Sequence, residues 1–420
     1  MTVTKQSHLF TKTRREAPAD ETSKNAQLLI RGGFVHKEMA GVYDLLPLGV
    51  RVLDKINEII REEMNAIGGQ EAYLSALQNP ELWKATNRWD DEVVDNWFKT
   101  ELKGGGMLGL GFTHEEPLTE LMKNHISSYR DLPQAVYQIQ TKFRNELRAK
   151  SGIMRGREFL MKDMYSFSRD EAEHEVFYAR SQEAYTNVFR RLGIGDRTYM
   201  TFASGGSFSK YSHEFQTVCD AGEDSIHIDE KSGIAVNEEV LKDEVLADLG
   251  LSRDSLVTKT AVEVGNIFSL GTKFSSALGL VYKDEAGETK PVVMGSYGIG
   301  PTRLMGTIVE TLSDDKGIVW PKSVAPYDVH LVVIGSEKPD VIAHAEKVAA
   351  DLSAQGFDVL LDDRDARTGE KLADADLIGI PMRVVISEKT MGEGKLEAKA
   401  RTAESASFMT FDEVVGALTS

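Results

Sequence analysis

Apolar and polar residues alternate along the segment from Tyr137 to Arg148. Successive side chains of a β-strand fall on opposite faces, so this alternation predicts a strand with one polar face. The residues on that face are Gln138, Gln140, Lys142, Arg144, Glu146 and Arg148. A polar loop follows at residues 149–156, and a second apolar run begins at Phe159. The pattern predicts an antiparallel hairpin with a long loop.

Apolar residues at helical spacing predict three helices in the first three quarters of the chain, at residues 48–67, 170–192 and 301–312. The first helix ends at two glycines, and the third has proline in its first turn, as helix ends often do. A short strand at residues 292–294 and a glycine turn precede the third helix. Residues 229–262 are polar and acidic with one short helical pattern, which favours a peripheral position.

The pattern changes after Pro326, where strands alternate with helices. Apolar runs predict strands, and amphipathic stretches predict helices between them. The strands are expected at residues 329–334, 359–361 and 383–386, and the helices at 339–355 and 368–378. This order is typical of a small α/β domain with a partly parallel sheet. We therefore expect two domains, residues 1–325 and 326–420.

The composition is that of an ordinary globular protein. The 420 residues suffice for two or three domains. No apolar run approaches the roughly 20 residues of a membrane span, and the N-terminus lacks the apolar core of a secretory signal. Cys219 is the only cysteine, which excludes an internal disulfide and a cysteine-rich zinc site. We expect a cytoplasmic protein with no membrane partner.

Charge is distributed unevenly along the chain. Residues 137–169 hold eight lysines and arginines against three acidic residues, whereas the whole chain has a net charge of −17. A cationic hairpin inside an anionic protein predicts a bound anion, and polyphosphate is the obvious one. The overall acidity argues mildly against a protein that coats nucleic acid, but it leaves local contacts to nucleic acid open.

Three segments of the chain resemble the signature motifs of class II aminoacyl-tRNA synthetases. Leu46–Arg51 resembles the first motif, Phe143–Glu146 with Arg157–Phe159 the second, and Gly298–Arg303 the third. Within this class the chain is similar to the bacterial-type prolyl-tRNA synthetases. The further segments that carry this similarity are residues 113–116, 137–144, 157–163, 165–167, 212–215, 265–272 and 317–321.

The resemblance implies both a fold and a reaction. The fold would be an α+β catalytic domain, an antiparallel sheet flanked by helices, followed by an α/β anticodon-binding domain. The reaction would activate L-proline with ATP and transfer it to the 3′ end of tRNA(Pro), releasing pyrophosphate and AMP. Mg²⁺ would accompany ATP and be held mainly by it, so no metal site of the protein itself is expected. The first motif implies a homodimer with Pro47 near the contact.

The resemblance assigns the nucleotide to residues of the second and third motifs. Arg144 would bridge the α-phosphate and the amino-acid carboxylate, two anions that repel each other. Glu146 would accept a hydrogen bond from the adenine amino group, and Arg155 would contact the γ-phosphate. The remaining ATP-binding candidates are Phe159 and Arg303, which would sandwich the adenine, and Gly298 and Gly300, which leave room for it.

The resemblance gives Thr113, Glu115 and Arg144 as candidates for proline binding. His213 and Glu214 are further candidates, because they stand where the family lines its amino-acid pocket. A carboxylate suits the secondary ammonium of proline, and a hydroxyl adds a directional hydrogen bond. The competing interpretation is a helix capping box with Thr113 as the N-cap. The family usually has proline before this threonine, but this chain has Phe112.

Candidates for tRNA contacts fall in two places. Lys150 lies in the loop that meets the tRNA acceptor end in the family. Arg364, Arg367 and Lys371 follow a strand of the second domain, where the family reads the anticodon. The competing interpretation of the acidic run at residues 362–365 is a solvated loop.

Between the second and third motifs many bacterial prolyl enzymes carry an inserted editing domain. Residues 229–262 are too few for one, since a stable core needs upwards of about 40 residues. We expect no cis-editing. Removal of alanine from mischarged tRNA would then fall to a separate trans-editing protein. Two alternatives remain open: a class II synthetase for another small amino acid, and a non-catalytic relative. The latter is expected to lose its ATP-contacting arginines, yet Arg144, Arg155 and Arg303 are all present.

Overall fold

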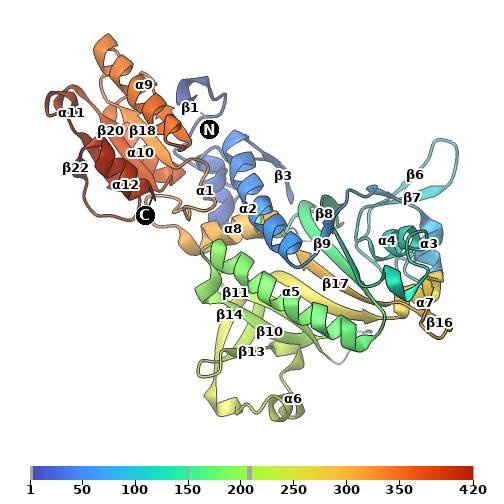
Figure 1. Ribbon diagram of the computed structural model, residues 1–420. Helices are drawn as coiled ribbons and strands as arrows, with labels where there is room; N and C mark the ends of the chain where they lie inside the picture. The colour runs from blue at the N-terminus through green and yellow to red at the C-terminus, as the bar shows by residue number, and fades with distance from the viewer. Residues whose placement is uncertain (1–2, 148, 150, 206–210, 420) are drawn as a thin grey trace. The chain divides into compact units, whose positions relative to one another are not determined.

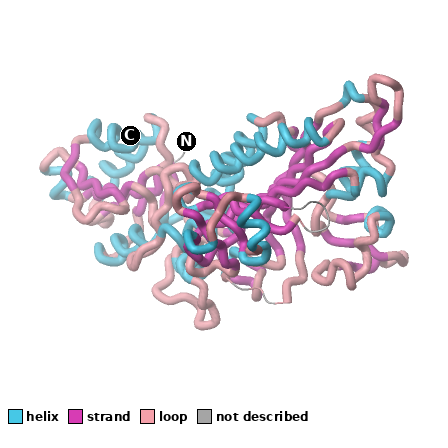
Figure 2. The backbone as a smooth tube through the Cα atoms, turned by 90° about the horizontal axis from the view of Figure 1, so that it is seen from below, coloured by secondary structure: helices cyan, strands magenta, loops and turns pink. Residues whose placement is uncertain are grey.

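The computed structural model describes residues 3–147, 149, 151–205 and 211–419. The chain forms two compact units, and both combine helices with strands (Figures 1 and 2). Unit 1 comprises residues 1–38, 43–55 and 308–420, and unit 2 comprises residues 39–42 and 56–307. The N-terminal segment therefore belongs to the same unit as the C-terminal domain, which differs from the linear division at residue 325.

Unit 2 is built on a nine-stranded sheet with the order β11-β10-β13-β12-β14-β17-β9-β8-β4. Its strands are β4 (Gln70–Glu71), β8 (Gln134–Phe143), β9 (Glu158–Ser168), β10 (Thr198–Ser204), β11 (Tyr211–Val218), β12 (Asp224–Asp229), β13 (Ile234–Asn237), β14 (Leu256–Gly271) and β17 (Val293–Ile299). The strands β8 and β9 pair antiparallel with Lys142 opposite Phe159, so the predicted hairpin is confirmed.

The long helix α5 (Glu171–Arg191) packs across β9, β14 and β17 of this sheet (Figure 1). Its N-cap is Asp170, whose carboxylate accepts a hydrogen bond from the Glu173 backbone N–H at 2.9 Å. The rings of Tyr185 and Phe189 on its buried face pack against Phe215 of β11. The predicted helix at residues 170–192 is thus confirmed, with its cap where an aspartate is favoured.

The sequence predicts that the acidic stretch at residues 229–262 is peripheral. In the structure this stretch instead supplies strands of the central sheet. It contributes β13, the short helix α6 (Asp243–Asp248) and the first part of β14. Ala235 and Ala261 of this stretch form a buried cluster with Ile226 and Ile228 of β12 (Asp224–Asp229). The prediction was wrong because single buried residues spaced among many acids are enough to hold short paired strands.

A smaller part of unit 2 lies beside β8. It contains a three-stranded sheet of β5 (Leu77–Gln78), β7 (Met107–Leu110) and β6 (Lys99–Glu101), with helices α3 (Pro80–Ala85), α4 (Glu115–Met122) and α7 (Lys273–Leu278). Aromatic packing of Trp83, Trp89, Trp97 and Phe112 forms its core. The hairpin of β15 (Val281–Lys283) and β16 (Thr289–Pro291) completes the unit.

Unit 1 contains a six-stranded sheet with the order β1-β19-β18-β20-β21-β22. Its strands are β1 (Val3–Lys5), β18 (Val329–Val333), β19 (Val359–Asp362), β20 (Met382–Ile386), β21 (Leu396–Ala400) and β22 (Ser407–Met409), and its helices are α1 (Lys24–Arg31), α9 (Pro339–Ala354), α10 (Thr368–Ile378), α11 (Glu388–Gly392) and α12 (Phe411–Thr419). The strands β1, β19, β18 and β20 are parallel, and β21 and β22 are antiparallel. The predicted α/β pattern is confirmed.

Three further elements link residues of both units. The helices α2 (Pro47–Ala66) and α8 (Pro301–Leu312) have their ends in different units, as has the hairpin of β2 (Val35–Met39) and β3 (Val42–Leu45). Both helices agree with the ranges predicted from the sequence. Within the described ranges, no helix has the length and apolar character that crossing a membrane requires.

Candidate active site

Two cavities of about 90 and 190 Å³ lie side by side in unit 2 and share lining residues. The strands β9, β14 and β17 and the first turn of α8 border the first cavity, and β9, β14, β17 and residues 112–115 border the second. The residues common to both are Arg144, Met161, Asn266 and Gly298. A single molecule can therefore extend through both cavities, with one end in each.

Arg144 lies directly after β8, and its guanidinium stacks between two aromatic rings. Its Cζ atom is 5.0 Å from the ring centre of Phe112 and 5.3 Å from that of Phe159. The Nε atom is buried without a hydrogen-bond partner. Burial, and next the nearby Arg303 charge, lower the pKa of Arg144 from its usual value. The site thus holds a charge that calls for an anion.

Arg303 comes from the first turn of α8 and faces the same cavity as Arg144 and Phe159. Its Nε donates to the Met154 carbonyl at 2.9 Å, and a terminal nitrogen donates to the Glu263 carbonyl at 2.7 Å. Two backbone acceptors therefore fix the plane of the guanidinium, which leaves its face available for stacking.

Arg155 and Glu146 form an ion pair of 3.0 Å at the outer part of the first cavity. Arg155 also contacts the Glu223 carboxylate. The Glu146 backbone carbonyl accepts a hydrogen bond from Arg157 at 3.0 Å, which holds this loop in place. Both predicted ATP-binding residues thus face the cavity, and they pair with each other.

Glycines form the wall of the first cavity where β17 runs into α8. A Cβ atom on Gly298 would lie 2.7 Å from the Met161 methyl group and 2.9 Å from the Asn266 side-chain oxygen. A Cβ atom on Gly300 would lie 3.2 Å from the Arg303 Cβ atom. A larger residue at position 298 would have to displace the ends of the Met161 and Asn266 side chains, both of which line the cavity.

Thr113 and Glu115 line the second cavity at the start of α4. The Thr113 hydroxyl donates to the Glu115 carboxylate at 2.6 Å and lies 3.2 Å from the Tyr165 hydroxyl. The N-cap of α4 is His114, and its side chain makes no capping hydrogen bond. The capping-box alternative is therefore wrong, since the Thr113 hydroxyl contacts cavity residues instead of capping the helix.

Beneath this loop lies a buried network that the sequence did not predict as part of a site. The Tyr165 hydroxyl accepts from the His114 backbone N–H at 3.0 Å and donates to Asp163 at 3.1 Å. Asp163 also forms an ion pair of 2.9 Å with Lys142. Burial lowers the pKa of Lys142, and the Asp163 charge opposes that shift. The predicted cationic strand face is thus partly neutralised inside the protein.

Arg88 is a further cavity residue that the sequence analysis missed. It lies 3.4 Å from the Glu115 carboxylate and 2.9 Å from that of Glu116. Burial raises the pKa of Glu116 to about 7, against the lowering effect of Arg88. Arg88 sits in an aperiodic segment between α3 and β6, where no pattern in the sequence marks it. Its charge balances that of Glu115 at the wall of the cavity.

His213 and Glu214 are not among the residues that line the two cavities. His213 contacts the Tyr178 hydroxyl at 2.8 Å, and Glu214 accepts hydrogen bonds from Gln216 and Asn237. Both lie on β11, where they face Ile267 and Asn266 of β14. The structure therefore does not bring them to the pocket with Thr113 and Glu115.

The tRNA-contact candidates differ in their surroundings. Arg364 forms ion pairs with Asp362 at 2.8 Å and with Asp374 at 3.0 Å. Lys371 is buried and donates to the Val333 carbonyl at 2.7 Å. Both side chains therefore hold unit 1 together, whereas Arg367 is exposed. Lys150 lies outside the described residues.

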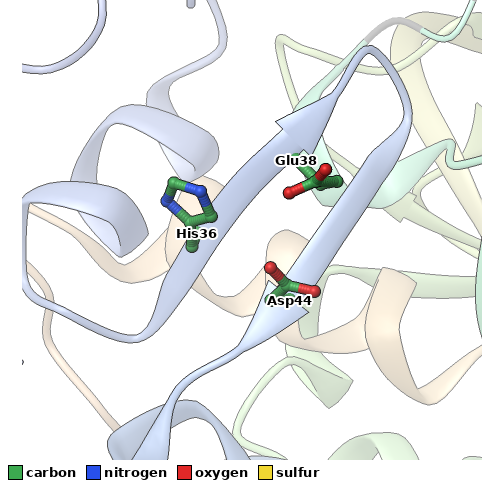
Figure 3. Close-up of side chains that lie close together, drawn as sticks. All are labelled: His36, Glu38 and Asp44. Atoms are coloured by element: carbon green, nitrogen blue, oxygen red, sulfur yellow. The ribbon is translucent and has the colours of Figure 1, made fainter.

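One group of side chains could bind a metal ion. The ligand atoms of His36, Glu38 and Asp44 lie within 4.8 Å of one another, and Figure 3 shows Glu38 and Asp44 facing each other across the β2–β3 hairpin. All three are exposed, so water competes for them, and among described residues no hydrogen bond orients them. The expectation of no metal site of the protein itself stays a prediction.

Comparisons with known proteins agree with this geometry. Residues 98–312 match the tRNA synthetase class II core domain (G, H, P, S and T), and residues 328–420 match an anticodon binding domain. A proline–tRNA ligase of Hyphomonas neptunium is 38% identical, covering 94% of this chain and 95% of its own. One of Rhizobium meliloti is 37% identical and covers 98% of both chains. The chain belongs to the proline–tRNA ligases.

Other relatives of this proline–tRNA ligase family are longer. The one of Bacillus cytotoxicus is 33% identical, and its alignment spans 552 residues with 96% of this chain. That relative therefore holds segments that have no counterpart among the 420 residues here. The chain, an aminoacyl-tRNA ligase of class II, is in this respect a short form of the family.

Solved structures establish the same fold. A Giardia lamblia prolyl-tRNA synthetase in complex with prolyl-adenylate superposes with a TM-score of 0.76 at 18% identity, covering 92% of this chain and 74% of its own. One of Cryptosporidium parvum, complexed with halofuginone and AMPPNP, gives 0.78 at 17% identity, covering 94% and 76%. The α+β catalytic domain followed by an α/β anticodon-binding domain is thereby confirmed.

Proposed function

We propose that the two cavities hold ATP and proline, and that Arg144 draws the proline carboxylate and the α-phosphate together. A proline carboxylate oxygen attacks the α-phosphorus, and pyrophosphate leaves as prolyl-adenylate forms. The terminal ribose hydroxyl of tRNA(Pro) then attacks the prolyl carbonyl, and AMP leaves. The observation that carries this proposal is the position of Arg144, which borders both cavities. Positioning and charge suffice for such a step, with no protein nucleophile.

Each cavity has groups suited to one substrate. The first offers Phe159 and Arg303 for the two faces of adenine, and Glu146 for its amino group. The Arg155–Glu146 ion pair would open as the γ-phosphate takes its place beside Arg155. In the second cavity the Glu115 carboxylate accepts from the secondary ammonium of proline, and Thr113 holds that carboxylate at 2.6 Å.

Mg²⁺ fits the residues at the phosphate end of this site. Asp224 and Glu263 line a third cavity beside Arg144 and Arg155, and both offer the hard oxygen ligands that Mg²⁺ prefers. Burial, and next the Glu263 charge, raise the pKa of Glu214 to about 7, which reflects a crowded set of carboxylates. When bound, Mg²⁺ neutralises charge on the phosphates; ATP would supply most of its ligands, and these two carboxylates would add to them.

Replacing Arg144 by alanine tests the proposal through proline-dependent exchange of pyrophosphate into ATP, a reaction that needs no tRNA. We expect the exchange rate to fall by about 10²–10³-fold, the usual loss when a transition-state donor is removed. Alanine in place of proline, assayed in parallel, tests the amino-acid specificity.

A suitable control variant is Arg190→Ala, which removes an exposed arginine of α5 whose side chain donates to Asn187 on the same helix. It should leave the exchange rate unchanged. Full exchange activity in Arg144→Ala, with a folded protein by circular dichroism, would contradict the role given to this residue.

The proposal extends to the assembly and the partners. The resemblance of Leu46–Arg51 to the first class II motif supports a homodimer, which sedimentation at twice 46.5 kDa would test. Residues 328–420 would recognise the anticodon of tRNA(Pro). We also propose a cytoplasmic location, checked by cell fractionation, and no cis-editing, so that any correction of alanyl-tRNA falls to a separate protein.

A further inference from the structure

Unit 1 contains a cavity of about 930 Å³ that is separate from the active site. The N-terminal segment, the end of α1, the loop after α8 and the length of α10 border it. Five cationic residues line it: Arg14, Arg15, Arg31, Lys316 and Arg367. A backbone hydrogen bond of 2.8 Å from the Arg14 N–H to the Arg31 carbonyl fixes two of them next to each other.

The acidic residues at this cavity do not neutralise its cations. Asp374 is paired with Arg364 at 3.0 Å, and Asp376 is paired with Arg383 at 2.9 Å. Only Glu370 remains on the lining without a described ion pair. In the part of the chain that the structure covers, none of the five cationic side chains forms an ion pair with an acid, and the buried Arg31 Nε has no hydrogen-bond partner.

This arrangement stands out against the charge of its surroundings. Residues 326–420 hold ten lysines and arginines against eighteen acidic residues, and the whole chain has a net charge of −17. Five unpaired cations around one cavity cost free energy through mutual repulsion unless an anion is bound. The cavity is far larger than a single phosphate needs, which favours an extended polyanion over a small one.

We propose that this cavity binds the sugar–phosphate backbone of tRNA and that the N-terminal segment is thus part of the RNA-binding surface. Arginine and lysine contacts to phosphates position an RNA without reading its sequence. Arg14, Arg15, Arg31 and Lys316 lie outside both matched domains, residues 98–312 and 328–420, so neither domain accounts for them. The inference rests on the proposed function in one respect, that tRNA is the substrate.

The double variant Arg14→Gln/Arg15→Gln and the single variant Lys316→Gln test this surface. All three side chains are exposed, so the fold should persist, as thermal melting would verify. We expect the KM for tRNA to rise about tenfold in the double variant, with kcat nearly unchanged. The dependence of tRNA affinity on salt should weaken by about one unit of log–log slope for each phosphate that the variant no longer binds.

Lys12→Gln is the matched control, because Lys12 is exposed in the same segment but does not line the cavity. It should leave the KM for tRNA and the salt dependence unchanged. Proline-dependent pyrophosphate exchange, which needs no tRNA, should stay at the wild-type rate in every variant. If the wild-type protein showed no proline-dependent pyrophosphate exchange, that result would contradict the proposed function and not this inference.

Two results would overturn the inference. One is an unchanged KM for tRNA and an unchanged salt slope in both test variants. The other is calorimetric binding of inorganic triphosphate that the double variant abolishes while tRNA affinity stays the same, since the cavity would then be a site for a small anion. Equal weakening of cognate and non-cognate tRNA is the expected sign of backbone contacts.

Discussion

At the scale of single residues, the carboxyl group of Glu214 sets a pH dependence. It lies on β11, and its neighbours Glu263 and Asp224 are also acidic. Burial, followed by repulsion from Glu263, raises its pKa to about 7 from the usual 4.5. The folded protein therefore binds a proton more tightly at this position than the unfolded chain does, so ionisation of the group favours unfolding.

We predict that Glu214→Gln reduces the loss of stability between pH 5 and pH 8. In the wild type the unfolded chain releases this proton near pH 4.5, and the folded protein releases it near pH 7. The stability that this group contributes to the folded protein therefore falls as pH rises through that window. The contribution is about 2 kcal/mol, measured as the free energy of unfolding in urea at several pH values. Glu183→Gln, on the exposed face of α5, should keep the wild-type slope.

Sequence reasoning found the residues that face the cavities where a motif marks them, as for Arg144, Arg303 and Thr113. It failed for polar residues whose partners are distant in sequence. Lys142 stands on the cationic face of an alternating strand, but Asp163 on the neighbouring strand neutralises it. An alternating pattern shows which residues share a face, and only the fold shows whether that face meets water or another polar group.

At the scale of elements, β9 positions the loop that begins α4. The Tyr165 hydroxyl on β9 bonds to the His114 backbone N–H and lies near the Thr113 hydroxyl, and Asp163 on the same strand fixes that hydroxyl in turn. Tyr165 and Asp163 thus set the position of Thr113 and Glu115, and Phe159 of the same strand borders the first cavity. Phe112, directly before Thr113, packs against the Arg144 guanidinium.

We predict that Tyr165→Phe raises the KM for proline about tenfold and leaves the KM for ATP unchanged. The substitution leaves the His114 N–H buried without an acceptor and frees the loop, at a cost of about 1–3 kcal/mol of stability. Pyrophosphate exchange at varied proline and ATP would measure both constants. Tyr282→Phe is the control, because it also loses one hydrogen bond, to the Arg169 carbonyl, away from this loop. An unchanged proline KM would contradict the positioning role.

The long helices could be predicted from periodicity, whereas many short strands could not, for physical reasons. The helices α2, α5 and α8 have long apolar stripes, and their ranges agree with the prediction. The strands β12 and β13 are six and four residues long; β13 pairs with β12, and β12 pairs with β14. In strands this short the alternation is too brief to be distinguished from a polar loop, since pairing with distant strands supplies most of their stability.

At the scale of the whole molecule, the region between the second and third motifs is filled by the catalytic unit itself. The strands β10 to β14 and the helices α5 to α7 account for most of it, and β12 to β14 belong to the central sheet. Alanine differs from proline by a few methylene groups, worth roughly 1–3 kcal/mol, so the pocket alone excludes it only weakly. We therefore expect discrimination against alanine to depend on another step or another protein.

We predict that the purified chain activates alanine detectably and leaves alanyl-tRNA(Pro) intact. Pyrophosphate exchange with alanine measures the first property, and the release of labelled alanine from preformed alanyl-tRNA(Pro) measures the second. The release should match spontaneous hydrolysis in buffer without protein. Enzyme-dependent release that is many times faster would show an editing activity and refute the prediction.

The stacked guanidinium of Arg144 should also make the stability of the folded protein depend on whether substrate is bound. Its charge is buried near that of a second arginine, Arg303, and the acidic groups Glu263, Glu146 and Glu115 oppose that repulsion. A nucleotide phosphate entering there replaces repulsion by attraction, so the loaded enzyme should withstand heat and proteases better than the empty one. The supply of ATP and proline would then govern how long each copy of the protein lasts, as well as how fast it works.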